Sequence, residues 1–310
     1  MSNTFGRIVA VALSASSLAV AGCGVGAPDL QQGAQPPADV AAAKGSEPPM
    51  LGMHMARGAH SHGGTSSPLM TFHNGTILTT AATQAIFWGT SWSNATFVAD
   101  KITGLDSWYE GFGASHYSEA SDEYTGTNGQ VTAATSYLGH LVDGSAAPSK
   151  APSTSTILAE VCKEITSPVA DGYYAVYTDT PRGHASYCAW HSYGTCSGVQ
   201  VQIAFFFDLD GDTGCDPQDT VTGHSEGLAA LANVSGHELS EARTDPDSGG
   251  WFDSSGAENG DKCAWTFGVP YVTFTNGTDW KIQGEWSNAA YTGGTGYPNS
   301  SGEAGCITGQ

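Results

Sequence analysis

The chain has 310 residues, of which 30 are acidic and only 10 are lysine or arginine, so its formal net charge at pH 7 is −20. Such a charge repels nucleic acid and anionic membrane surfaces, and we therefore expect no nucleic-acid partner. A hydrophobic content of 40% over this length suits a globular domain with a sizeable core.

The N-terminus carries the pattern of an export signal. Arg7 precedes the apolar run IVAVALSASSLAVA, which is too short to span a bilayer as a mature helix. The run ends in VAGC, which resembles the bacterial lipobox and predicts a signal peptide over residues 1–22 with Cys23 as the lipidated first residue. An ordinary signal peptidase site is the alternative. We expect an exported lipoprotein, anchored in a bacterial membrane at the cell surface or in the periplasm, or an extracellular protein.

Residues 23–66 combine the lipidated cysteine with a segment rich in Ala, Gly, Pro, Gln and Ser that has no apolar periodicity. Such a composition predicts a flexible tether, because it offers too little apolar surface to offset the entropy of ordering. His54, His60 and His62 could bind a metal, but a solvated polar linker is the simpler interpretation. Residues 67–310 follow as one globular domain without an internal repeat or a further apolar segment able to span a membrane.

The domain alternates strand and helix patterns, which predicts an α/β fold with a mixed sheet and packed helices. Strands are expected at residues 84–88, 173–177 and 199–207, with a turn region rich in Gly and Cys between the last two. Helices are expected over residues 97–112 and 157–165. A long helix through Leu228 and Leu239 should end before Pro246, and short β segments should complete the chain.

Six cysteines remain after Cys23, and an even number in an exported chain indicates disulfides. Their spacing does not choose among about 15 possible pairings. A zinc cluster built from these cysteines is the weaker interpretation, because the sequence contains no CxxC pair.

An acidic segment, DLDGDTGCDPQD, resembles a calcium-binding loop. Its carboxylates stand at loop positions 1, 3, 5, 9 and 12, where oxygen ligands of calcium are expected, and belong to Asp208, Asp210, Asp212, Asp216 and Asp219. Thr213 replaces the turn-forming glycine at position 6, and Asp219 is shorter than the usual glutamate. A solvated acidic loop is the alternative to a calcium site.

The letters GHSEG at residues 223–227 fit the GxSxG pattern of a serine hydrolase. Their context does not fit it, because no strong strand precedes the motif and no suitable acid and histidine follow in order. Ser225 is better interpreted as the N-cap of the long helix.

Near the C-terminal end of that helix, SGHELSEARTDPD places His237 and Glu241 on one face with Glu238 beside them. This is the layout of HExxH zinc enzymes with glutamate in place of the second histidine. In such sites His237 and Glu241 would hold zinc, while Glu238 would accept a proton from a water that the metal acidifies. An ordinary solvated helix end is the alternative.

A third ligand is required, and several residues compete for the role. Asp247 has the spacing of the third ligand in metzincin-type sites, but Thr244 replaces the glycine needed there. Asp261 and Glu258, in GAENGDKCAW, are downstream candidates. His191, in CAWHSYGTC, could complete the shell or stabilise a developing oxyanion.

Three segments together carry a family resemblance: MTFHNGTILTTAATQAIFWGTSWS, CAWHSY, and SGHELSEARTDP followed by WFDSSGAENGDKCAW. They are similar to the opening strand, the Cys-x-x-His segment and the HELAE-type segment of the phosphate-induced protein/EXORDIUM family and its bacterial relatives. The resemblance covers residues 69–306. It singles out His191, His237, Glu238, Glu241, Thr244, Pro246, Glu258, Asp261 and Cys263.

Asp247 is not part of the family pattern, so the resemblance favours Asp261 or Glu258 as the third ligand. It also implies a secreted, growth-related protein rather than a defined reaction. The residues themselves predict a surface-anchored zinc-dependent hydrolase of the metallopeptidase type, acting on a peptide or protein substrate. The alternative is a non-catalytic surface binding protein with a structural metal.

Overall fold

The structure, a computed structural model, describes residues 47–59 and 67–309. The predicted signal peptide, Cys23, most of the predicted tether, His60 and His62 lie outside the described residues. All described residues belong to one contact unit, Ser46–Gln310.

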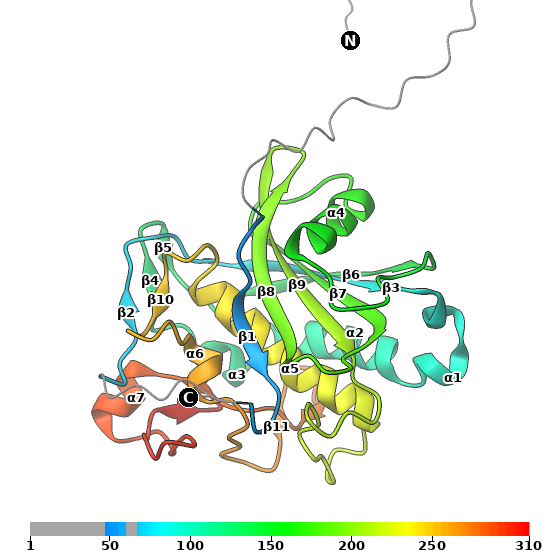
Figure 1. Cartoon of the computed structure of the whole chain (residues 1–310). Helices are drawn as coiled ribbons and strands as arrows, with labels where there is room; N and C mark the ends of the chain where they lie inside the picture. The colour runs from blue at the N-terminus through cyan, green and yellow to red at the C-terminus, as the bar shows by residue number, and fades with distance from the viewer. Residues whose placement is uncertain (1–46, 60–66, 310) are drawn as a thin grey trace, which may run out of the picture. The chain divides into compact units, whose positions relative to one another are not determined.

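A mixed sheet of six strands, ordered β1-β8-β9-β7-β3-β6, forms the centre of this unit (Figure 1). The four strands from β9 to β6 run parallel, whereas β8 is antiparallel to β9 and β1 is antiparallel to β8. The parallel strands β7 and β9 are almost wholly buried, as expected when both faces of a sheet are covered. The strands are β1 Leu51–Met55, β3 Ala81–Trp88, β6 Thr135–Asp143, β7 Gly172–Pro181, β8 Tyr187–Cys196 and β9 Val199–Asp208.

Helices pack on both faces of this sheet, and β8 shows how they divide. His191 contacts Glu241 of α5, whereas a Cβ on Gly194 would meet Leu158 of α4. Residues three apart on a strand point to opposite faces, so α4 and α5 lie on opposite sides of β8. The helix α2 packs against α5 and β6. The longer helices are α2 Lys101–Phe112, α4 Thr154–Glu164 and α5 Glu226–Thr244.

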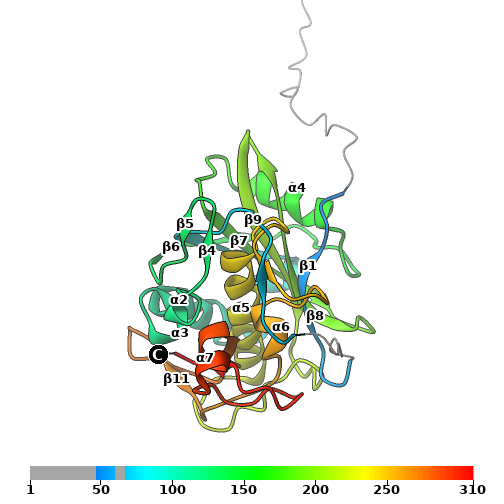
Figure 2. The same cartoon turned by 90° about the vertical axis from the view of Figure 1, so that its left-hand side faces the viewer.

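Short elements complete the fold, and those of the C-terminal part lie beside α5 (Figure 2). They form four two-stranded sheets, which pair β2 with β10, β4 with β5, β11 with β12, and β13 with β14. The short helices are a 3-10 turn at Thr90–Ser93, α1 Ala95–Val98, α3 His116–Glu119, α6 Asn259–Lys262 and α7 Asn288–Gly293. The short strands are β2 Thr71–Phe72, β4 Thr125–Gly126, β5 Gly129–Gln130, β10 Trp251–Phe252, β11 Val272–Thr273, β12 Asp279–Trp280, β13 Glu285–Trp286 and β14 Cys306–Ile307.

The mixed α/β class and the long helix were predicted correctly, but three local predictions were wrong. The single helix expected over residues 97–112 is interrupted at Ala99 and Asp100, which separate α1 from α2. The supposed turn region between residues 177 and 199 contains strand β8. Residues 51–55, assigned to the tether, form strand β1 and pair with β8. Backbone hydrogen bonds to β8 and burial against it stabilise the short strand β1, and neither can be inferred from the composition of the segment.

Three disulfides are present, Cys162–Cys196, Cys188–Cys215 and Cys263–Cys306, as the even cysteine count predicted. Two of them tie β8 to its surroundings, one at each end of the strand. In the chain-entropy description, loops of these lengths stabilise a fold by about 3–4 kcal/mol each. The edge region that carries His191 is therefore held in place covalently.

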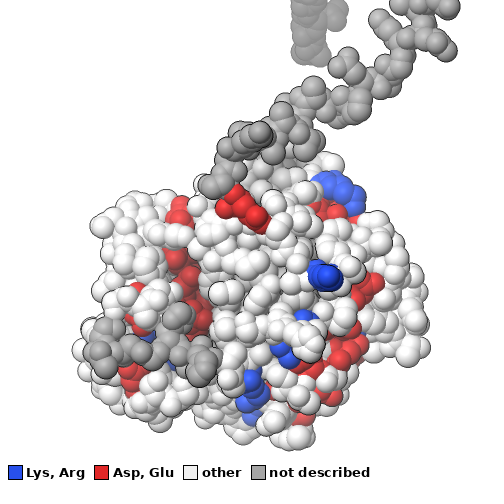
Figure 3. All heavy atoms as spheres, viewed as in Figure 1, with Lys and Arg blue, Asp and Glu red and all other residues white. Residues whose placement is uncertain are grey.

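Ser225 is the N-cap of α5 and accepts a hydrogen bond from the Leu228 amide, so the cap interpretation of the GxSxG letters is confirmed. Within the described residues, no helix combines the length and apolar character needed to cross a membrane. The face shown in Figure 3 is largely uncharged, with small groups of acidic side chains, some of which lie beside basic ones.

Candidate metal centre

Helix α5 carries His237, Glu238 and Glu241 in its C-terminal half, and all three side chains are fully buried. Every residue of α5 from Gly227 to Thr244 is buried, because the sheet, α2 and the C-terminal elements surround the helix. The alternative of a solvated helix end is therefore wrong. Burying this many polar groups is costly unless each is paired or bound to a ligand.

Two other segments bring ligand-type side chains to the same place. His191 projects from β8 and its Nε2 lies 3.3 Å from Glu258 Oε2 and 3.8 Å from Glu241 Oε2. Glu258 is the N-cap of α6, where Asp261 completes a capping box with it. On α5 itself, His237 Nε2 lies 3.0 Å from Glu241 Oε1.

These side chains form two groups that share Glu241. His191, Glu241 and Glu258 form the first group, and His237, Glu238 and Glu241 form the second. In each group the ligand-type atoms lie within 4.8 Å of one another. Besides His191 Nδ1, five buried atoms in these groups have no hydrogen-bond partner among the described residues: His191 Nε2, His237 Nε2, Glu238 Oε2, Glu241 Oε2 and Glu258 Oε2.

The spacing of the atoms matches that of ligands around a small cation. Four ligands about 2.1 Å from one ion in a tetrahedron stand roughly 3.4 Å apart. The measured separations of 3.0, 3.3 and 3.8 Å scatter around this value. Imidazole nitrogen and carboxylate oxygen are both accepted zinc ligands, so these donors suit such an ion. His191 and His237 approach different oxygens of Glu241, so the donors form two overlapping groups that must draw together to surround one ion.

Electrostatics point in the same direction. Burial, followed by mutual repulsion, raises the pKa of Glu238, Glu241 and Glu258 well above the usual value. Burial lowers the pKa of His191, and it lowers that of His237 to about 4. No lysine or arginine within the described part of the chain forms an ion pair with the three glutamates. At neutral pH the imidazoles are uncharged, as metal ligands must be, and the carboxylates need protons or a cation.

One contact acts against metal binding through His237. The Gln283 amide nitrogen lies 3.1 Å from His237 Nδ1, while it also donates to the Gly260 carbonyl. An imidazole that binds metal through Nε2 carries its proton on Nδ1 and is normally held by an acceptor there. Gln283 Oε1 is already engaged by the Trp265 amide and by His54 Nε2. Metal binding at His237 therefore requires the Gln283 side chain to shift from Nδ1.

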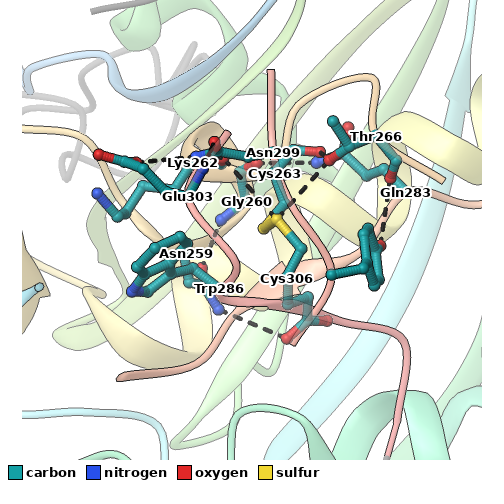
Figure 4. Close-up of a disulfide and its surroundings, with 12 residues drawn as sticks. Asn259, Gly260, Lys262, Cys263, Thr266, Gln283, Trp286, Asn299, Glu303 and Cys306 are labelled. Atoms are coloured by element: carbon teal, nitrogen blue, oxygen red, sulfur yellow. Dashed lines mark hydrogen bonds between the residues drawn. A yellow bond between two sulfur atoms is a disulfide. The ribbon is translucent and has the colours of Figure 1, made fainter. Parts of the chain in front are cut away.

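The short helix α6 approaches the cluster closely because of a glycine. A Cβ on Gly260 would lie 2.9 Å from His237 Nδ1 and 3.0 Å from Glu241 Oε1. The Asp261 amide uses this closeness to donate to Glu241 Oε1. The disulfide Cys263–Cys306 follows directly after α6, and Asn299 holds the Lys262 carbonyl, so this segment is fixed (Figure 4).

The structure separates the candidates for the third ligand. Glu258 joins the group around Glu241, while Asp261 Oδ1 lies 3.7 Å from His237 Nε2 at its border. Asp247 instead accepts a hydrogen bond from Thr76 and takes no part in either group. His191, predicted either to complete the ligand shell or to stabilise a developing oxyanion, lies among the ligand-type side chains.

The carboxylates of the predicted calcium loop do not gather around one point. Lys101 Nζ lies 2.5 Å from Asp210 and 3.8 Å from Asp208, and Arg182 forms two bonds with Asp212. Asp216 and Asp219 accept backbone amides of their own loop. None of the close groups of ligand-type side chains found in the described residues includes these five aspartates.

Sequence reasoning missed Gly52 and Gln283, and it wrongly preferred a solvated linker for His54. His54 is fully buried, its ring lies edge-on to His237 with centroids 4.3 Å apart, and its amide donates to Glu238 Oε1. The usable signal was the apolar run MLGMHM between two prolines and Arg57, which has the length and character of a strand. Gln283 left no local signal, because only the tertiary fold brings it to His237.

Comparison with protein-family models, with curated proteins and with solved structures finds no match for this chain.

Proposed function

We propose that this protein is an exported zinc-dependent hydrolase of the metallopeptidase type, with its metal held by His237, Glu241, Glu258 and His191. The observation that carries the proposal is the convergence of five buried ligand-type atoms that have no hydrogen-bond partner among the described residues. Leaving three carboxylates together in a protein interior costs several kcal/mol per charge unless a cation compensates. The donor set of imidazole and carboxylate suits zinc.

Glu238 is not among the proposed ligands, and this additional carboxylate beside the metal supports a catalytic function. Its Oε2 has no hydrogen-bond partner in the described part of the chain, and its Oε1 accepts only the His54 amide at 3.3 Å. The Oε2 atom of Glu238 is therefore available to accept a proton from a water and return it to a leaving group. A bound zinc ion would supply the Lewis acidity that activates water and polarises a carbonyl.

The neighbouring residues support this arrangement. His191 and Glu258 lie on one side of Glu241, and His237 lies on its other side. The rigid supports are a sheet strand tied by two disulfides, a helix buried on all sides and a short helix tied by the third disulfide. Holding reacting groups on rigid elements is what a hydrolytic site requires.

Export and anchoring are part of the proposal. Three disulfides suit an oxidising compartment outside the cytoplasm. Lipidation of Cys23 would anchor the chain in the membrane, and Cys23→Ser should move it from the membrane fraction to the soluble fraction. Equal membrane retention of both proteins would contradict the anchor.

A second function has one observation in its favour. The two groups together offer more than four protein donors, enough to close a tetrahedral shell completely, and closed shells are typical of structural zinc. In that case the protein is a surface binding protein whose metal holds β8, α5 and α6 together.

Two measurements test the proposal. Elemental analysis of the purified protein should give close to one zinc per chain, and a folded protein with no transition metal would contradict both functions. Cobalt substitution then separates them, because an added hydroxamate should change the absorption spectrum only if one coordination position is open. The hydrolase should also cleave an unstructured protein such as casein. A spectrum that the hydroxamate does not change, together with no cleavage of casein, would show that the metal is structural.

A further inference from the structure

Strand β1 lies directly over the candidate metal centre, between β8 and α6 (Figure 1). It pairs antiparallel with β8, the strand that carries His191, and Leu51 is the register partner of that histidine. Without β1, strand β8 would be the edge of the sheet. An exposed strand edge is a ready template for pairing with another extended chain.

The backbone of β1 binds the groups that the proposed chemistry needs. The Gly52 amide donates to Glu258 Oε1 at 3.2 Å, and the His54 amide donates to Glu238 Oε1 at 3.3 Å. These residues are two apart, so their amides point to the same side of the strand, toward the cluster. A main chain that donates alternate amides to catalytic carboxylates is positioned as a bound peptide would be.

Gly52 is the point of closest approach. A Cβ at this position would overlap Glu241 Oε2 and lie 2.7 Å from His191 Nε2. The backbone of Gly52 also has a φ of +24°, which side chains rarely tolerate. Only a glycine lets the main chain pass so close to the ligand-type atoms.

The pairing of β1 is less regular than that of the rest of the sheet. Its register with β8 shifts twice within five residues, whereas the pairing of β8 with β9 is continuous. The Met53 side chain is 37% exposed. A groove of about 280 Å³ runs along the outer side of β1 and is lined across from it by Phe252, Glu258 and Asp261. The groove therefore borders the buried centre at Glu258, beside β1.

We propose that β1 occupies the substrate-binding edge of β8, so that the site takes an extended polypeptide as an added strand and β1 must leave before that substrate can reach it. This inference rests on the proposed hydrolase function and names its substrate class, an extended peptide with a small residue at the centre. Main-chain pairing along a strand edge supplies the affinity, and the narrow space at Gly52 supplies the selectivity. The protein is a latent enzyme that carries its own competing strand.

Displacing β1 in the full chain tests this directly. Gly52→Val should expel the strand, because the added side chain has no space beside Glu241 and His191. Met53→Val places the same side chain on the neighbouring exposed position and is the matched control. His54→Pro is a second route, because it removes the amide bonded to Glu238. Hydrogen exchange should show β1 amides unprotected in Gly52→Val and His54→Pro but not in Met53→Val.

The binding readout uses a labelled synthetic peptide with the sequence EPPMLGMHMAR, residues 47–57. It should bind both displaced variants and bind wild type and Met53→Val at least about tenfold more weakly, since their edge is occupied. The same peptide with valine at position 52 should not bind. Failure of the native peptide to bind a folded variant whose β1 amides are unprotected would overturn the inference, whether or not any protein is hydrolysed.

Activity provides the second readout and separates this inference from the proposed function. Casein cleavage by the displaced variants should exceed that of wild type by about tenfold or more, and the native peptide should suppress the excess. If wild type cleaves casein and the displaced variants are folded but no faster, the inference fails while the hydrolase stands. If the peptide binds as expected but no form cleaves any protein, the hydrolase fails while strand binding at β8 stands. Loss of bound zinc in both variants would show that β1 belongs to the metal site and would overturn its role as a competing strand.

Discussion

Two carboxylate clusters in this protein look alike by composition and differ in what neutralises them. One is the candidate metal centre, which is built around Glu241 and is fully buried. The other joins Asp143 of β6 with Glu160 and Glu164 of α4, again with ligand-type atoms within 4.8 Å of one another. In the second cluster Lys163 contacts all three carboxylates.

The contrast shows how to interpret acidic clusters in this chain. The Asp143 cluster contains its own cation and reaches solvent through the half-exposed Lys163 side chain, so nothing further is needed there. The aspartates Asp210 and Asp212 resemble it, because Lys101 and Arg182 neutralise them. Among the described residues, the centre around Glu241 combines three buried glutamates with uncharged imidazoles and no Lys or Arg ion pair. A cation from solution is the natural complement only in this last case.

Removing a ligand should give the largest effect. Glu241→Gln and His237→Ala should each abolish zinc binding. Each removes one of two proposed ligands, whose Oε1 and Nε2 atoms lie 3.0 Å apart. Glu160→Gln is the matched control in the neutralised cluster and should keep full zinc content. The measurement is metal content after equilibration with zinc and gel filtration. Full zinc content in both ligand variants would remove the distinction between the two clusters.

Removing the metal should have the second-largest effect. A ligand present at roughly 1,000 times its dissociation constant stabilises a fold by about 4 kcal/mol. For a chain of this size, that corresponds to a fall in Tm on the order of 10 °C when a chelator is added. Glu241→Gln should not respond to the chelator, whereas Glu160→Gln should respond like wild type. Thermal unfolding with and without chelator checks this, and equal Tm values for wild type in both conditions would contradict a metal that links β8, α5 and α6.

Glu238→Gln should keep zinc and fold but lose hydrolysis by a factor on the order of 100. The two side chains are nearly isosteric, and the amide cannot accept the proton that the carboxylate accepts. The change is best made together with Gly52→Val, so that β1 does not limit the rate, and casein cleavage is compared with that of Gly52→Val alone. Undiminished cleavage would show that Glu238 is not the base, while the ligand assignment would be unaffected.

Local sequence patterns were sufficient for part of this architecture. The spacing of His237, Glu238 and Glu241 specified a helix face and a ligand chemistry, because both are set within one turn of helix. The cysteine count specified disulfides, although the pairing needed the fold. The spacing rule that suggested Asp247 fails here. Pro246 follows the C-cap of the helix, Asp245, and the Asp247 side chain accepts a hydrogen bond from Thr76 instead.

The rest depends on strand pairing, which no local pattern encodes. His191 meets Glu241 because β8 lies antiparallel beside β9 and over α5, and this register follows from the whole sheet. Strand β1 was missed because its five residues, three of them Leu or Met, stood in a segment whose overall composition was that of a tether. Gln283 reaches His237 across 46 positions of sequence.

The smallest effect concerns pH and the cluster that has its own cation. Burial first, and Asp143 second, raise the pKa of Glu160 to about 7 from an ordinary value of 4.5, although Lys163 opposes the rise. The folded state therefore holds this proton more tightly than the unfolded state, so its contribution to stability is full below pH 4.5 and is lost as pH rises through 7. Glu160→Gln resembles the protonated form and should lack this decline.

Between pH 4.5 and 8, the free energy of unfolding of Glu160→Gln should therefore improve relative to wild type, by less than about 1 kcal/mol because solvent and the half-exposed Lys163 screen the group. Urea unfolding at several pH values measures this difference, and Glu110→Gln on the exposed side of α2 is the control. A relative gain of several kcal/mol would mean that Lys163 fails to neutralise its neighbours. The Asp143 cluster would then need an outside cation as much as the centre around Glu241 does, and burial without an internal cation would no longer distinguish the metal site.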